Sequence, residues 1–198
     1  MLVEFLITAL LIELTPGPNM AYLALLSANQ GRLAGLRAVA GVTAGLGFYA
    51  LLAAAGLGTV VRDTPQLLAL LRAAGVVYLL YLAFEAWAPQ RENSPARSPT
   101  GWQSPFWRGF LTNVLNAKAA IFYTLLLPRF IDPGAGQIGA QALGLGAVHL
   151  TVASLVHLSI VLGASRAHAV VAGAQHQPFV RAGFALALVA TALWLALP

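Results

Sequence analysis

The chain has 198 residues, of which 59% are hydrophobic and 9% are charged. Soluble domains carry roughly 25% charged residues because their surface must be wetted, so this composition excludes an ordinary soluble fold. A net charge of +5 would suggest a nucleic-acid partner in a soluble protein. Here the basic residues lie between apolar stretches, where they set membrane topology and indicate no nucleic-acid partner.

Six apolar stretches predict an all-α protein embedded in the lipid bilayer, since about 20 apolar residues cross some 30 Å of hydrocarbon. Met1–Leu14 lacks the basic segment and cleavage site of a signal peptide and is interpreted as the start of an interrupted first span. The polar stretch Pro89–Pro105 is rich in proline and predicts an irregular loop. The expected spans are 2–27, 36–61, 67–87, 109–130, 138–162 and 179–197.

The Pro-rich loop, about 89–105, divides one transmembrane domain (1–198) into repeat 1, about 1–88, and repeat 2, about 106–198. Three spans in each half force the halves into opposite orientations, which is the inverted-repeat plan of many secondary transporters. We therefore expect two inverted three-helix repeats.

Arginines beside alternate loops predict the orientation. Three lie at one end of the bundle (Arg62, Arg72, Arg129) and seven at the other: Arg32, Arg37, Arg91, Arg97, Arg108, Arg166 and Arg181. The positive-inside rule places the richer end in the cytoplasm. We expect a multi-pass inner-membrane protein with both termini outside the cytoplasm.

The first span is interrupted by Thr15-Pro16-Gly17-Pro18-Asn19. Pro16 and Pro18 lack amide hydrogens, so the carbonyls of Ile12 and Leu14 lose their helical partners. Within hydrocarbon, such groups are tolerated only where protein or a water-filled cavity satisfies them. A broken helix offers amide hydrogens to a carboxylate and carbonyls to an ammonium. We favour a cavity-lining role over a purely structural kink.

Asn113, Asn116 and Lys118 mark a second interruption, in the fourth span. A lysine at the bilayer centre costs roughly 2.5–3.5 kcal/mol on insertion scales and calls for a partner. Glu13 is the other charged side chain expected near mid-depth. We hypothesise that Glu13 and Lys118 face one aqueous cavity and influence each other's protonation; the alternative is an ion pair that only locks the halves together.

His149 and His157 are eight residues apart and share one face of the fifth span. With Thr151 and Ser154 they are candidates for a proton route, since histidine titrates near neutral pH, or are simply buried, hydrogen-bonded polar residues. Without nearby carboxylates they make a poor metal site, and we expect no metal. Two other histidines are expected to be solvated in the last cytoplasmic loop: His168 and His176.

Gly41 and Gly45 allow close helix packing, which we expect within one chain, although a homo-oligomer stays open. The chain has no Walker loop, and the metalloprotease motif H-E-x-x-H and the hydrolase motif G-x-S-x-G are also absent. We therefore expect neither an enzyme nor a cofactor.

Four motifs occur in order along the chain: Thr15–Asn19; the glycines Gly31, Gly35, Gly41 and Gly45; Phe106–Ala119; and Leu127–Phe130. Together they resemble the LysE/RhtB family of bacterial amino-acid exporters, and the length and span pattern agree across the whole chain. The third motif is similar to the family's G-F-x-x-N-x-x-N-P-K-A, with Ala117 in place of the proline, which predicts a gentler second break. The fourth is close to L-P-Q-F, with Arg129 in place of the glutamine.

The resemblance implies a bacterial inner-membrane exporter of amino acids or related small metabolites, driven by the proton-motive force. In this hypothesis Pro16, Gly17 and Pro18 open the first helix, and Lys118 meets the substrate carboxylate or exchanges a proton. Glu13 meets the ammonium or balances Lys118. Neutral hydrogen bonds come from Thr15, Asn19, Asn113 and Asn116. A metal-ion exporter and a non-transporting membrane scaffold are the alternatives.

Overall fold

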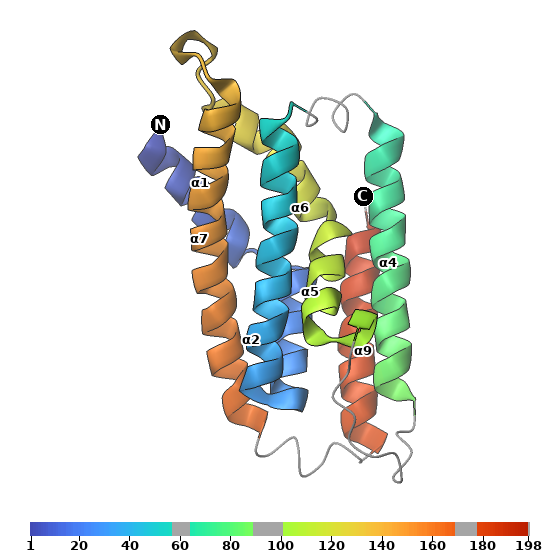
Figure 1. Cartoon of the computed structure of the whole chain (residues 1–198). Helices are drawn as coiled ribbons and strands as arrows, with labels where there is room; N and C mark the ends of the chain where they lie inside the picture. Colours follow the sequence, from blue (N-terminus) through green and yellow to red (C-terminus); the bar gives the residue numbers. More distant parts are fainter. Residues whose placement is uncertain (57–63, 89–100, 169–177, 198) are drawn as a thin grey trace.

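The computed structural model describes residues 1–56, 64–88, 101–168 and 178–197, and these are helical with short connections and no strand (Figure 1). The all-α class is therefore confirmed for the described residues. The main helices are α1 (Leu2–Leu14), α2 (Pro18–Ala54), α4 (Pro65–Trp87), α5 (Pro105–Val114), α6 (Ala117–Ile121), α7 (Ile138–Ala164) and α9 (Pro178–Ala196).

Four of the described helices are long and apolar enough to cross a membrane: α2, α4, α7 and α9. A fifth span results if α5 and the following segment Ala117–Phe130, bent by 52°, are counted together. The bend lies at the predicted second interruption. Beyond α6 the segment continues as a π-helical turn, Phe122–Leu126, and a 3-10 turn, Leu127–Phe130, instead of the regular helix that the apolar pattern predicts.

Gly31 is a break inside α2 that corresponds to the predicted boundary between the first two spans. Its φ of 81° and ψ of 178° are not helical, and a positive φ favours glycine. Figure 1 shows the two parts of α2 lying side by side. A Cβ on Gly35 would collide with Ser27, so the two parts touch. The end of the predicted second span, 57–61, lies outside the described residues.

The prediction that His168 is solvated in the last cytoplasmic loop is wrong. This histidine is half-buried, and its Nδ1 lies 3.1 Å from the carbonyl oxygen of Ala28, where a solvated side chain was expected. The tight turn at Gly31 makes room for the imidazole, whose Cδ2 would lie 3.1 Å from a Cβ at that position. His176 lies outside the described residues.

The Pro-rich loop is shorter than predicted at its C-terminal end. Residues 89–100 are outside the described part of the chain, but Gly101–Gln103 forms a 3-10 turn and Pro105 is the first residue of α5. Proline suits the first helical position because its missing amide hydrogen would have no helical partner there. The fourth span therefore begins at Pro105, before the expected residue 109.

The surface and the interior have the polarity expected of a protein in lipid. Large apolar side chains are exposed along the helices, including Leu70, Val77, Phe84, Leu155 and Leu186. The buried polar and charged residues of the described chain are Glu13, Asn19, Ser27, Thr112, Asn113, Asn116, Thr124, His149 and His157. Such groups are costly within hydrocarbon and usually mark substrate or ion pathways.

Small residues bring α2 and α5 into backbone contact within one chain. A Cβ on Gly41 would collide with the carbonyl oxygen of Phe106, and one on Gly109 with that of Ala38. One on Gly45 would lie 2.7 Å from Nδ2 of Asn113. The predicted packing of Gly41 and Gly45 inside one chain is confirmed.

We expect Gly41→Ala to lower the thermal stability of the solubilised protein, by roughly 1–3 kcal/mol, because the new methyl group overpacks a backbone contact. Gly144→Ala is the matched control, since a Cβ there has no neighbour within 4 Å. Thermal unfolding in one detergent measures both variants. Equal midpoints for the two would contradict the close packing of α2 on α5.

Candidate functional site

The two helix breaks meet inside the bundle. Thr15–Gly17 separates α1 from α2, and Leu115–Asn116 separates α5 from α6. Asn19 Nδ2 donates a hydrogen bond of 2.7 Å to Asn113 Oδ1, which joins the residues flanking the two breaks. The remaining amide atoms of this pair, Asn19 Oδ1 and Asn113 Nδ2, are buried without a hydrogen-bond partner. Buried polar atoms of this kind call for water or a ligand.

Lys118 links the second break to the first. Its ammonium Nζ donates to the carbonyl oxygen of Thr15 at 2.8 Å, and its backbone amide donates to Asn116 Oδ1 at 3.0 Å. Asn116 is thereby the N-cap of α6. No side chain caps the start of α2 at Gly17, so the two facing helix starts differ. The cation thus satisfies a carbonyl that the broken first span leaves free.

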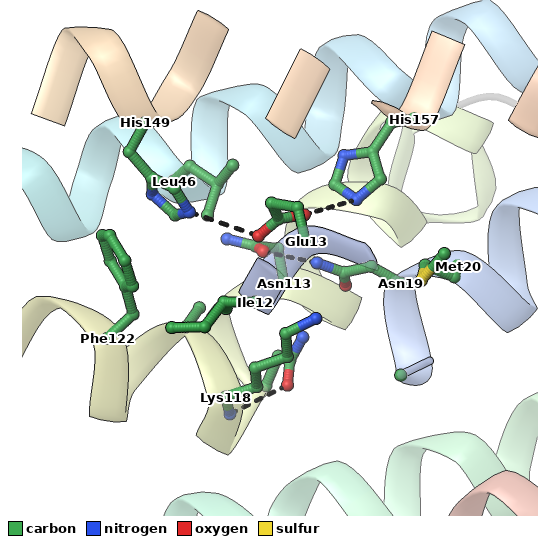
Figure 2. Close-up of a pocket in the computed structure, with 13 residues that line it drawn as sticks. Ile12, Glu13, Asn19, Met20, Leu46, Asn113, Lys118, Phe122, His149 and His157 are labelled. Atoms are coloured by element: carbon green, nitrogen blue, oxygen red, sulfur yellow. Dashed lines mark hydrogen bonds and ion pairs between the residues drawn. The ribbon is translucent and has the colours of Figure 1, made fainter. Parts of the chain in front are cut away.

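Glu13 is the centre of a buried cluster on the other side of the break. Glu13 as a whole is 6% exposed, and its carboxylate lies between two imidazoles of α7 (Figure 2). Oε1 is 3.2 Å from His149 Nε2, and Oε2 is 3.3 Å from His157 Nε2. The expectation that the two histidines have no nearby carboxylate is therefore wrong, because α1 packs against α7 and brings Glu13 to them.

Aromatic residues hold His149 in place. Its Nδ1 lies 3.1 Å from the hydroxyl of Tyr123, and its ring stacks on Phe122 at a centroid distance of 3.8 Å. Both aromatics belong to the π-helical turn Phe122–Leu126, and π-bulges frequently occur at functional sites. His157 has no such support, because its Nδ1 is buried without a partner. The Nδ1 atom of His149 therefore has a hydrogen-bonding neighbour, whereas that of His157 has none.

Thr151 and Ser154 make their hydrogen bonds away from the two histidines. Thr151 is exposed and donates to the Ala147 carbonyl of its own helix at 2.9 Å. The Ser154 hydroxyl lies 3.0 Å from that of Thr43 on α2.

Glu13 and Lys118 line the same cavity without pairing directly. No ion pair within 4.0 Å joins them, since Glu13 contacts the two histidines and Lys118 contacts Thr15. The cavity has a volume of ≈ 10 Å³, about the space of one water molecule. Eight of the predicted site residues line it: Glu13, Gly17, Asn19, Asn113, Asn116, Lys118, His149 and His157.

Three predicted site residues lie elsewhere. The Thr15 hydroxyl donates to the Leu11 carbonyl of its own helix at 2.9 Å, so Thr15 offers its backbone carbonyl to the site and not its side chain. Pro16 lies in a groove against Thr191 and Trp194 of α9. Pro18 is buried at the start of α2.

A family model described as "LysE type translocator" matches residues 10–197, nearly the entire chain. The chain belongs to the LysE type translocator family. A leucine efflux protein of Salmonella typhimurium is 30% identical over 161 residues, covering 80% of this chain and 76% of the relative. A homoserine/homoserine lactone efflux protein of the same organism is 28% identical over 182 residues, covering 91% and 88%. No solved structure matches.

Tyr49 packs behind the candidate site of this translocator, and the sequence interpretation missed it. Its hydroxyl donates to the Val114 carbonyl at 2.7 Å, at the end of α5, and its ring stacks on Tyr123. The same π-helical turn that holds His149 is thereby tied to the second break. A tyrosine hydroxyl in an apolar span was the available signal, because it needs a hydrogen-bond partner there.

Two larger cavities of the translocator lie beyond the central one. The Arg72 cleft, of ≈ 570 Å³, is lined by Arg72, Thr15, Lys118, Trp194 and Leu197, among others. The Arg108 vestibule, of ≈ 230 Å³, is lined by Tyr22, Glu85, Arg108, Phe184 and Leu188, among others. The cleft lies near the start of α4 and the end of α9, and the vestibule near the end of α4 and the start of α9. The two cavities therefore lie toward opposite ends of the bundle.

No group of three or more His, Asp or Glu side chains in the described part of the translocator is arranged to hold a metal ion.

Proposed function

We propose that the chain is a secondary transporter that exports amino acids or related small metabolites across the bacterial inner membrane, driven by the proton-motive force. The observation that carries the proposal is the meeting of two broken helices at a cavity lined by Lys118, Glu13, His149 and His157. The relatives, a leucine efflux protein and a homoserine/homoserine lactone efflux protein, supply the substrate class.

The substrate site is the pair of breaks. The uncapped start of α2 offers amide hydrogens to a carboxylate, and Lys118 lies beside it with its ammonium on the Thr15 carbonyl. The carboxylate of an incoming substrate binds the Lys118 ammonium, which then leaves the Thr15 carbonyl oxygen. That oxygen accepts a hydrogen bond from the substrate ammonium instead. Asn19 and Asn113 contribute the buried amide atoms that now lack partners.

Glu13 and the two histidines are the proton-coupling group. A carboxylate between two imidazoles can hold a proton in several positions, because the carboxylate and both rings can each bind one. Glu13 and Lys118 line one cavity, so a proton added at Glu13 removes a negative charge that attracts the substrate ammonium and weakens the binding of that ammonium. Proton entry and substrate release are coupled in this way.

The six spans form two inverted repeats in this proposal, with α1 and the first part of α2 forming the first span. The contact pattern supports this arrangement. The second helices of the two halves pack together, α2 on α7, and so do the third helices, α4 on α9. The contact of α1 with α7 has its counterpart in that of α5 with α2. A twofold axis in the membrane plane produces such pairing.

Alternating access then exposes the central cavity first to one end and then to the other. The Arg108 vestibule lies at the arginine-rich end, which we assign to the cytoplasm with both termini outside, and the Arg72 cleft lies at the opposite end. The central cavity of ≈ 10 Å³ is too small for an amino acid, so binding requires the helices around it to move apart.

Efflux from proteoliposomes preloaded with a labelled panel tests the function. We expect wild-type protein to export one class among leucine, homoserine, homoserine lactone and lysine, faster with an imposed proton gradient than without. Protein-free liposomes are the control. Export of no panel member, with the folded protein verified in the same vesicles, would overturn the proposal and favour a membrane scaffold.

A further inference from the structure

The Arg108 vestibule contains an ion pair that the central site does not use. Arg108 Nη1 lies 2.9 Å from Glu85 Oε2, and Arg108 Nη2 donates to Glu85 Oε1 at 3.0 Å. The pair is bidentate and joins the end of α4 to the start of α5. Glu85 and Arg108 are 30% and 19% exposed, so both charges border the cavity and are not sealed in a core.

The rest of the vestibule wall is divided between polar and apolar side chains. Leu26, Leu82 and Leu188 provide an apolar surface, and Asn29, Gln30 and Gln103 provide neutral hydrogen-bonding groups. The hydroxyl of Tyr22, which also lines the vestibule, is buried without a hydrogen-bond partner. With ≈ 230 Å³, the vestibule exceeds cavities of about 150 Å³ that bind benzene.

We propose that this vestibule is a second, entry site for an α-amino acid with an apolar side chain, in which Arg108 binds the carboxylate and Glu85 binds the ammonium. The inference rests on the proposed export function and adds to it a site and a substrate preference. Leu26, Leu82 and Leu188 contact the substrate side chain, and the Tyr22 hydroxyl donates to the substrate carboxylate.

The chemistry of the pair matches a zwitterion. Arginine presents a planar fork that binds a carboxylate bidentately, and here it already binds one, that of Glu85. A zwitterion separates the pair and gives each charge a new partner of opposite sign. Neither Arg108 nor Glu85 is left unpaired, so substrate entry leaves no uncompensated charge in the partly buried vestibule.

The alternative role of the pair is purely structural, holding α4 to α5. The two roles differ in their response to ligands with one charge. A structural pair matters equally for every ligand, because its loss perturbs the whole vestibule. A binding pair matters group by group: Arg108 for ligands with a carboxylate, and Glu85 for ligands with an ammonium.

The experiment measures leucine efflux from proteoliposomes, with 4-methylpentanoate and isopentylamine as competitors on the loading side. These probes carry the leucine carbon skeleton with only the carboxylate or only the ammonium. For Arg108→Gln we expect about a tenfold or greater rise in the KM for leucine and in the Ki for 4-methylpentanoate, with the Ki for isopentylamine little changed. For Glu85→Gln we expect the crossed pattern.

Arg37→Gln is the matched control, because Arg37 is an exposed arginine at the same end of the bundle and does not line the vestibule. Like Arg108→Gln, it removes one positive charge from this end of the bundle. We expect it to leave the KM for leucine and the Ki values of both competitors unchanged. If Arg108→Gln does not fold, Arg108→Lys keeps the charge and loses the bidentate fork, and it should raise the KM and the Ki for 4-methylpentanoate by a smaller factor.

The outcomes separate the two proposals. Equal changes for all three ligands, or no change in either variant, would overturn the entry site while wild-type efflux still supports export. Absence of efflux of any amino acid by the wild type would overturn the export function, and the entry site with it.

Discussion

Lys118→Ala is expected to lower gradient-driven efflux by about 100-fold or more, because it removes the one lysine of the chain from the cavity where the two breaks meet. A hydrogen bond made by a charged group is worth about 1.5–3 kcal/mol, and here the lysine also satisfies the Thr15 carbonyl at 2.8 Å. The measurement is the initial efflux rate of the substrate found for the wild type, at matched protein density and proton gradient.

Arg72→Ala is the matched control for this variant. Arg72 is a cation of the same cleft, and its Nη1 donates to the Leu197 carbonyl at 3.3 Å, away from the breaks. We expect it to retain most of the wild-type rate. A Lys118→Ala protein that is folded and exports at the wild-type rate would remove Lys118 from the mechanism.

The helix breaks could be predicted from sequence because their causes are local. Prolines and glycine at Thr15–Asn19 remove backbone hydrogen bonds wherever the helix lies, and a lysine in an apolar span needs a partner in any fold. The six apolar stretches could be predicted for the same reason, and the structure contains four long apolar helices in these regions. The second break, where Ala117 replaces the family's proline, bends by 52°.

The partners across the break could not be predicted, because they depend on which helices pack together. Glu13 meets His149 over 136 positions of sequence, and only the packing of α1 on α7 decides that contact. The sequence instead suggested Lys118 as the partner of Glu13. Thr15 illustrates the same limit on a smaller scale, since its hydroxyl binds its own helix and its carbonyl faces Lys118.

Arg108 contributes both to the membrane orientation, through its charge, and to the vestibule, through its ion pair with Glu85. In the sequence it counts only toward the positive-inside bias. Its pairing with Glu85 becomes visible once α4 and α5 are placed side by side at the vestibule. Loop charge is therefore a poor guide to whether an arginine is a topogenic residue alone or a binding residue as well.

Glu13→Gln is expected to uncouple export from the proton gradient. The amide keeps the size of the carboxylate and can still hydrogen-bond one of the two imidazoles at 3.2 and 3.3 Å, but it carries no charge and binds no proton. Net efflux against a substrate gradient should fall about tenfold or more, whereas exchange of labelled for unlabelled substrate persists. Substrate efflux and proton uptake, followed with an internal pH dye, are measured in the same vesicles.

The control is Glu4→Gln, because Glu4 is an exposed carboxylate on the same helix, paired only with the chain terminus at 3.2 Å. It should leave both proton uptake and efflux unchanged. If Glu13→Gln keeps wild-type proton uptake per exported substrate, the coupling site lies elsewhere, and the buried Glu13–histidine cluster is then a structural tie between α1 and α7. If exchange is lost together with net efflux, Glu13 belongs to substrate binding and not to coupling, because a coupling residue spares the exchange that needs no proton.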